Sequence, residues 1–149
     1  MNSSNNRSNN SSKNKNNKNR ILIVDDEPDI TLIFAMGLED NGFTVDAFND
    51  PIQALSNFKS GVYDLALIDY KMPNMNGFEL YREIRKVDHK IKVCFVTAFE
   101  LYYEELKNKF QPSSLTASSE HKREDVKCFI PKPVDIDDLV VRINEELNS

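Results

Sequence analysis

Short apolar runs alternate with amphipathic segments along most of the chain. Three runs are continuous, at residues 21–24, 65–68 and 93–96. Continuous runs of this length are typical of strands that are buried on both faces. Two further strands are predicted at residues 44–48 and 126–130. The apolar pattern therefore predicts five strands.

Four other segments place apolar residues three and four positions apart, as an amphipathic helix does. Pro28 and Asp135 mark the starts of the first and last of these helices, and Gly42 and Gly61 lie past the ends of the first two. Strands that alternate with helices predict a parallel sheet covered by helices on both faces. Helix by helix, the apolar positions are Ile30, Ile33, Phe34, Gly37 and Leu38; Ile52, Leu55 and Phe58; Phe78, Leu80, Tyr81 and Ile84; and Ile136, Leu139, Val140, Ile143 and Leu147.

Two regions fall outside this alternation. Residues 1–19 consist mostly of Asn, Ser and Lys, and such a stretch cannot offset the entropy of ordering its backbone. We therefore predict a disordered tail there and one domain over residues 20–149. Residues 99–110 have apolar positions roughly in helical phase, whereas residues 111–125 are polar and turn-rich and predict a mobile loop.

The net charge of −5 is unevenly distributed over the 149 residues. Residues 1–20 carry five basic and no acidic side chains, which leaves 14 basic against 24 acidic side chains, a net charge of −10, for the remainder. A domain this acidic argues against direct binding to nucleic acid. No apolar run approaches the roughly 18 residues that cross a membrane, so membrane insertion is not expected.

The cysteines and histidines give little sign of metal or redox chemistry. Cys94 and Cys128 lie inside apolar runs without the spacing of metal ligands, and we interpret both as reduced core residues. Together with an N-terminus that lacks the apolar segment of a secretory signal, this favours a cytoplasmic protein. His89 and His121 are isolated among polar neighbours and are predicted to lie on the surface.

Polar side chains follow four of the five predicted strands at the point where each strand ends. Because the carboxyl ends of parallel strands form one edge of a sheet, we expect these side chains to converge there. Clustered carboxylates repel one another and are tolerated mainly around a cation, and oxygen ligands suit Mg²⁺. An aspartate can also attack phosphorus to form an aspartyl phosphate, so this set is consistent with a phosphoryl acceptor at Asp69. The residues are Asp25, Asp26 and Glu27 after the first strand, Asp69 after the third, Thr97 after the fourth and Lys132 after the fifth.

These residues stand in motifs that resemble the receiver domain of response regulators, the CheY-like family of two-component signal transduction. The motifs are Ile-Leu-Ile-Val-Asp-Asp-Glu at 21–27, Leu-Ile-Asp-Tyr-Lys-Met-Pro-Asn-Met-Asn-Gly at 67–77, Val-Thr-Ala at 96–98 and Phe-Ile-Pro-Lys-Pro at 129–133. The resemblance implies a flavodoxin-like α/β fold, with five parallel strands in the order 2-1-3-4-5 and helices on both faces. The segment from 97 to 132 is longer than is usual in this family.

The resemblance also implies a phosphorylation site and a metal site. Asp69 would be the phosphorylated residue. Asp26, Asp69 and the backbone carbonyl of Lys71 would ligate Mg²⁺, and Asp25 would hold a metal-bound water. Such a domain receives its phosphoryl group from a sensor histidine kinase or a phosphotransfer protein, and acts on a downstream protein that the sequence does not identify.

Other positions would respond to phosphorylation or set its lifetime. By resemblance, Thr97 and Lys132 would contact the phosphoryl group, and the ring of Phe129 would swing inward when Thr97 moves. Lys71 and Phe99 stand at the positions that flank the path of the water that removes the phosphate. Beyond accepting the group and slowly hydrolysing it, no enzymatic activity is expected.

Two other functions fit parts of the pattern. A haloacid-dehalogenase-like phosphatase also uses an aspartate nucleophile, but that family has Asp-x-Asp after its first strand, whereas Asp69-Tyr70-Lys71 follows the third. The stronger alternative is an atypical receiver that acts as a phosphorylation-independent protein-binding module. The acidic pair Asp25-Asp26 is present together with Asp69, Thr97 and Lys132, which argues against this alternative.

Overall fold

The computed structural model describes residues 18–98 and 126–149. Five parallel strands form one sheet in the order β2-β1-β3-β4-β5, which confirms the predicted topology. In chain order the strands are β1 (Arg20–Val24), β2 (Thr44–Phe48), β3 (Leu65–Ile68), β4 (Lys92–Thr97) and β5 (Cys128–Pro131). The helices are α2 (Pro28–Asp40), α3 (Pro51–Asn57), α4 (Gly77–Val87) and α6 (Ile136–Leu147).

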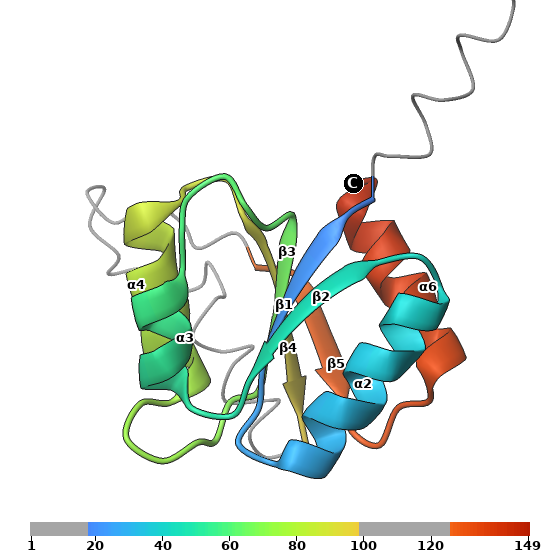
Figure 1. Cartoon of the computed structure of the whole chain (residues 1–149), viewed down its shortest axis with the longest axis horizontal. Coiled ribbons are helices and arrows are strands. Elements are labelled where there is room, and N and C mark those ends of the chain that lie inside the picture. Colours follow the sequence, from blue (N-terminus) through green and yellow to red (C-terminus); the bar gives the residue numbers. More distant parts are fainter. Residues whose placement is uncertain (1–17, 99–125) are drawn as a thin grey trace, which may run out of the picture.

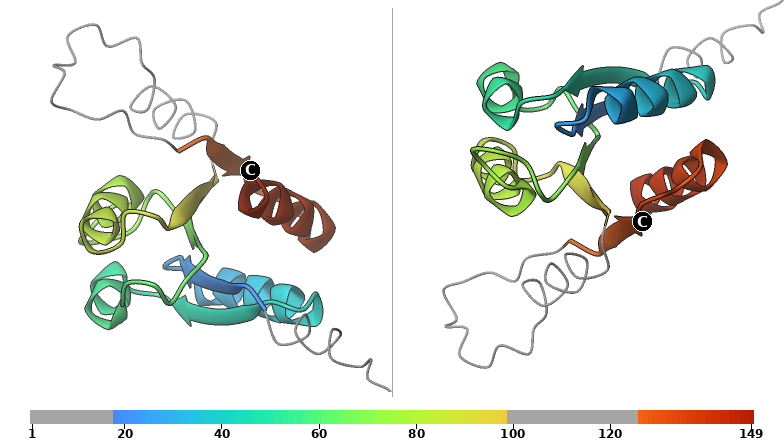
Figure 2. Two further views of the ribbon diagram at one scale, coloured as in Figure 1. Left: turned by 90° about the horizontal axis from the view of Figure 1, so that it is seen from above. Right: turned by 90° about the horizontal axis from the view of Figure 1, so that it is seen from below.

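Helices cover both faces of the sheet, as the alternating pattern predicts. Helices α2 and α6 lie on one face and α3 and α4 on the other (Figure 1), and the same division is visible from above and below (Figure 2). Strands β1, β3 and β4 contribute side chains to a separate apolar core on each face. Because the central strands are buried on both faces, they have the continuous apolar runs seen in the sequence.

Side-chain caps fix where α3, α4 and α6 begin, with the carboxylate of Asp50 accepting from the backbone N–H of Ile52 in α3. The carboxylate of Asp135 accepts a hydrogen bond from the backbone N–H of Asp138, which confirms Asp135 as the start of α6. At the start of α4, Asn76 and Glu79 each accept a hydrogen bond from the other's backbone N–H. The cap of α4 anchors the segment that connects β3 to α4.

The interpretation of the cysteines is correct for their burial and wrong for their bonding. Cys94 in β4 and Cys128 in β5 are almost completely buried, but they are joined by a disulfide. The two residues are direct partners in the parallel register of β4 and β5, with their Cα atoms 4.6 Å apart. Sequence spacing does not show this register, because the two cysteines are 34 residues apart.

Several predictions fall on residues outside the described ranges. They are the tail over most of residues 1–19, the helical phase of 99–110, the loop at 111–125, and the placements of Phe99 and His121. Within the described ranges, His89 is exposed, as predicted. No helix there has the length and apolar character needed to cross a membrane.

Candidate functional site

The site lies where β1 and β3 end side by side. The last residues of the two strands, Val24 and Ile68, are direct partners in the parallel register. The chain therefore leaves both strands at the same level, and the backbone N–H of Asp69 donates to the carbonyl of Val24 at 2.9 Å. On the other side of β1, the N–H of Asp25 donates to the carbonyl of Phe48 at 3.1 Å. These bonds hold the first acidic residue after each strand in a fixed place.

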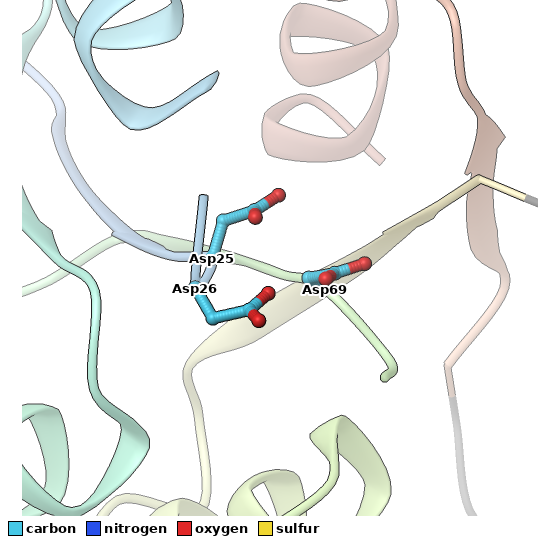
Figure 3. A group of neighbouring side chains, drawn as sticks. All are labelled: Asp25, Asp26 and Asp69. Atoms are coloured by element: carbon cyan, nitrogen blue, oxygen red, sulfur yellow. The ribbon is translucent and has the colours of Figure 1, made fainter. Parts of the chain in front are cut away.

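Three carboxylates gather at this edge of the sheet, as the sequence predicts. Asp25, Asp26 and Asp69 each contribute one oxygen to a group whose members all lie within 4.8 Å of one another. Figure 3 shows these side chains, two from the loop after β1 and one from the end of β3. Asp25 is 3% exposed and Asp69 is 7% exposed, whereas Asp26 is half-buried. The group is thus both close-packed and largely withdrawn from water.

Lys132 supplies a positive charge to the same group. Its Nζ donates to Asp25 Oδ2 at 2.8 Å and lies 3.7 Å from Asp69 Oδ1. Glu27, which is exposed, lies 3.7 Å from the same ammonium. The backbone N–H of Lys132 donates to the carbonyl of Thr97 at 2.8 Å, so the residue is anchored to β4 as it leaves β5.

These surroundings change the proton affinities of two groups. Burial raises the pKa of Asp69 to about 7, and the negative charge of Asp25 adds to the effect, while Lys132 partly opposes it. Burial disfavours the charged form of Lys132, but its hydrogen bond to Asp25 and the nearby carboxylates outweigh burial and raise its pKa. Lys132 therefore stays protonated and positively charged, whereas Asp69 is the carboxylate whose negative charge the site stabilises poorly.

Thr97 and Phe129 lie on the last two strands of the sheet, β4 and β5. Thr97 ends β4 at 1% exposure and is the register partner of Pro131 in β5. Phe129 is buried, and its ring stacks on that of Phe95 with the centroids 5.9 Å apart. The hydroxyl is thus on the strand that pairs with β3, and the aromatic ring is on the next strand, the one that Lys132 follows.

The loop from Asp69 to Gly77 is closely folded. The N–H of Gly77 donates to the carbonyl of Tyr70 at 2.7 Å, and a Cβ on Gly77 would collide with the main-chain oxygen of Asp69. Asn74 has a φ of 74°, a left-handed conformation that asparagine tolerates better than most residues. Lys71 is exposed within this loop. Glycine is required at 77 because the helix begins directly against the residue that carries the carboxylate.

One supporting residue was missed in the sequence. Asn49 Nδ2 donates to the backbone carbonyl of Asp25 and to the hydroxyl of Thr31, both at 2.9 Å. It therefore ties the acidic loop to β2 and α2. The only sign of this role in the sequence is that an asparagine directly follows the strand at 44–48. Asparagine is common at such turns, so its presence alone does not indicate a supporting residue.

The donor set fits a hard divalent cation. Three carboxylate oxygens within 4.8 Å offer the ligand type that Mg²⁺ prefers, and neighbouring carbonyls and water complete such sites. A divalent cation would also offset the mutual repulsion that the single ammonium of Lys132 offsets only in part.

Comparison with known proteins identifies the fold family. The model of the response regulator receiver domain matches residues 21–109. The chain belongs to the response regulator receiver family. A receiver domain is a signalling module rather than an enzyme. Its acidic triad of Asp25, Asp26 and Asp69 is typical of the Mg²⁺ site of receivers.

Relatives of this receiver domain include whole regulators and sensor proteins. It is 31% identical over 128 residues to the response regulator ArlR of Staphylococcus saprophyticus, covering 86% of this chain and 52% of that protein. It is 40% identical over 81 residues to the sensor protein EvgS of Escherichia coli, covering 54% of this chain and 7% of EvgS. The chain spans about half the length of the first regulators that it matches.

Solved receiver structures superpose well on this one. A CheY-like receiver domain protein from Methanospirillum hungatei has a TM-score of 0.72 at 28% identity, with 89% of this chain and 95% of that chain covered. TrrA from Thermotoga maritima, solved in complex with Mg²⁺-BeF, has a TM-score of 0.66 at 26% identity, with 85% and 97% covered. These matches agree with the parallel sheet and its two helical layers.

Proposed function

We propose that this receiver domain accepts a phosphoryl group on Asp69 in the presence of Mg²⁺, and that phosphorylation switches its binding to a partner protein. The observation that carries the proposal is the convergence of Asp25, Asp26 and Asp69 with the ammonium of Lys132. Asp69 directly follows the buried strand β3 and lies in the loop that carries the Asp-Tyr-Lys-Met-Pro segment of the receiver motif.

The chemistry of the transfer follows from the charges of the group. An oxygen of Asp69 attacks phosphorus, the bond from phosphorus to the donor breaks, and the donor leaves with that electron pair. The donor is a phosphohistidine on a sensor kinase or a phosphotransfer protein. Mg²⁺ bound by Asp26 and Asp69 would neutralise part of the charge on the phosphoryl oxygens. Lys132, 3.7 Å from Asp69, is close enough to pair with one of those oxygens.

Each of the other site residues has a proposed part. Asp26 and Asp69 would hold the cation directly with the backbone carbonyl of Lys71, and Asp25 would hold it through water. Asp25 carries a hydrogen bond from Lys132 at 2.8 Å, which suits an indirect role because its oxygen is already engaged.

Phosphorylation would then be transmitted through β4 and β5. The hydroxyl of Thr97 would close on a phosphoryl oxygen, and the ring of Phe129 would follow because it packs beside that strand. Lys71 and Phe99 would set the lifetime of the aspartyl phosphate by controlling the approach of water.

The relatives support a sensor kinase as the upstream partner. The matching segments of EvgS and of the sensor kinase/phosphatase CqsS of Vibrio cholerae are parts of sensor proteins, so this domain type occurs within signalling chains that contain kinases. We propose a cytoplasmic location, a downstream protein partner, and no direct contact with nucleic acid. We also propose that residues 1–19 form a tail separate from the receiver at 20–149.

Incubation of the full chain with acetyl phosphate and Mg²⁺ tests the proposal. Intact-mass measurement should show the addition of one phosphoryl group, and removal of Mg²⁺ with a chelator should abolish it. Asp69→Asn should remain unlabelled, because an amide is a poor nucleophile. Asp64→Asn is a matched control, since Asp64 lies on an exposed turn before β3 and away from the site.

The same experiment separates the two functions. An unlabelled wild-type chain that stays folded would reject the acceptor role and favour a phosphorylation-independent binding module. Full labelling of Asp69→Asn at another residue would reject Asp69 as the acceptor.

A further inference from the structure

The disulfide between Cys94 and Cys128 joins the two strands that lead to the site. The cysteines face each other across β4 and β5, on the sheet face that α2 and α6 cover. Going toward the site, the next register pairs are Phe95 with Phe129, Val96 with Ile130, and Thr97 with Pro131. The sulfur bridge therefore lies three register positions before Thr97, and Lys132 is the fourth residue after Cys128.

A positive charge lies beside one of the sulfurs. Arg142 of α6 donates from Nη2 to Cys128 Sγ at 3.7 Å and to the carbonyl of Phe129 at 3.4 Å. Its side chain is 36% exposed and lines a cleft of about 440 Å³ together with Ile130 and Val141. Cys128 itself is 2% exposed, and the guanidinium, which also lies 3.8 Å from a carboxylate oxygen of Glu145, is a polar group in contact with its sulfur. The cleft brings solvent to the guanidinium that contacts this sulfur.

We propose that Cys94 and Cys128 form a reversible redox pair that couples the oxidation state of the chain to its phosphoryl site. In the proposed cytoplasmic location thiols are kept reduced, and disulfides that form there are usually transient and serve in sensing or catalysis. A structural role would require a compartment in which the bond persists. The bridge joins β4 and β5, the strands through which phosphorylation is proposed to be transmitted, and this placement favours the sensing role.

Hydrogen peroxide oxidises the pair in two steps. The thiolate of Cys128 attacks one oxygen of hydrogen peroxide, the O–O bond breaks, and hydroxide leaves as Cys128 becomes a sulfenic acid. The thiolate of Cys94 then attacks the sulfur of Cys128, which forms the S–S bond and expels the second hydroxide. The protons of the two thiols convert both hydroxides to water. Two thiols and one peroxide thus give one disulfide and two waters, and thiol–disulfide exchange with a dithiol reverses the reaction.

The effect on phosphorylation rests on the proposed function. Lys132 is held by Asp25, and its N–H is bonded to the carbonyl of Thr97. We expect the end of β4 to shift relative to β5 as the phosphoryl group is transferred, so that the hydroxyl of Thr97 closes on a phosphoryl oxygen during the transfer. The disulfide makes these strands one covalent unit close to that end. The oxidised chain should therefore be phosphorylated more slowly than the reduced chain.

The full chain is compared after treatment with hydrogen peroxide and after treatment with a dithiol. Intact mass should show the loss of two hydrogen atoms in the oxidised chain. Because both cysteines are buried, thiol alkylation is carried out after unfolding in denaturant, and it should label both cysteines only in the reduced chain. With acetyl phosphate and Mg²⁺, the reduced chain should be labelled about tenfold faster, equivalent to about 1.4 kcal/mol of barrier. The N–H of Lys132 should exchange more slowly in the oxidised chain, since it bridges β5 and β4.

Variants separate the bridge from other effects of oxidation. The rate at which acetyl phosphate labels Cys94→Ala should be the same with and without peroxide, and the same should hold for Cys128→Ala. Arg142→Gln should slow disulfide formation severalfold while leaving labelling of the reduced chain unchanged. Circular dichroism of each variant confirms that it is folded.

Two results would overturn the proposal. One is a chain that keeps both thiols after peroxide treatment. The other is equal labelling rates and equal exchange of the Lys132 N–H in the two redox forms. If neither form is labelled, the proposed phosphorylation fails on its own, and the exchange of this N–H alone then decides whether the bridge restrains the strands.

Discussion

Replacing Asp69 with asparagine should stabilise the folded chain in the absence of metal. The carboxylate is 7% exposed and lies beside Asp25 and Asp26. Burial and the charge of Asp25 raise its pKa from 3.8 to about 7, which corresponds to roughly 4 kcal/mol of unfavourable free energy for the charged form. The asparagine amide is uncharged but must still lose water, so we expect a gain of about 2 kcal/mol. The hydrogen bond from Lys132 to Asp25, 2.8 Å long in the wild type, does not involve Asp69, so we expect the substitution to leave it in place.

The sign of the pH dependence provides the sharper test. Between the unfolded pKa of 3.8 and the folded pKa of about 7, the folded chain binds a proton at Asp69 that the unfolded chain does not. The free energy of unfolding of the wild type therefore falls as the pH rises through this window and levels off above about pH 7. The advantage of Asp69→Asn should be largest near pH 8 and should shrink as the pH falls toward 4.

Urea unfolding of both chains, with a chelator present, measures this difference at several pH values. Asp40→Asn serves as a control because Asp40 is exposed at the end of α2, and its effect should stay within about 0.5 kcal/mol. Addition of Mg²⁺ at ten times its dissociation constant should stabilise the wild type by about 1.4 kcal/mol and Asp69→Asn by much less. An Asp69→Asn chain no more stable than wild type at pH 8, or a difference that does not change with pH, would refute the reasoning.

Four further substitutions address the metal, the loop and the lifetime of the phosphate. Asp26→Asn should weaken Mg²⁺ binding, measured by calorimetry, without lowering the thermal stability of the metal-free chain, because it removes one of the repelling charges. Gly77→Ala should destabilise the chain by about 2 kcal/mol or more and slow labelling by acetyl phosphate, because its Cβ would displace the backbone of Asp69. Lys71→Asn and Phe99→Glu should each speed loss of phosphate by about tenfold in phosphate-release kinetics, and unchanged rates in both would reject their proposed shielding role.

The elements of the fold that could be predicted are those in which the sequence pattern is local. The strand at Ile21–Val24 and the helix start at Asp135 agree with the structure to within one residue. In both cases the signal is contained in a few consecutive side chains, an apolar run or a capping residue. The contact of Asn49 with Asp25 was not predicted, since it joins the turn after β2 to the loop after β1 and depends on how these strands lie together.

The candidate site was predictable for a related reason. All carboxyl ends of a parallel sheet meet at one edge, so residues at those ends converge whatever the detailed register. The reach of a long side chain absorbs small shifts: Lys132 contacts Asp25 and also lies near Asp69. The distances from Lys132 to the two carboxylates and the raised pKa of Asp69 depend on how deeply these groups are buried. The sequence pattern indicates burial only in outline.

The cysteine pair shows where such reasoning fails. A disulfide requires that two particular residues be direct partners, here with Cα atoms 4.6 Å apart. A slip of β5 along β4 by one residue would turn Cys128 to the opposite face of the sheet, and a slip of two would move it about 7 Å along the strand. Either shift would prevent the bond, while the lysine after β5 would still emerge at the same edge. The long side chain of Lys132 can therefore reach the carboxylates over a range of strand positions, whereas the disulfide forms only if Cys94 and Cys128 are direct register partners.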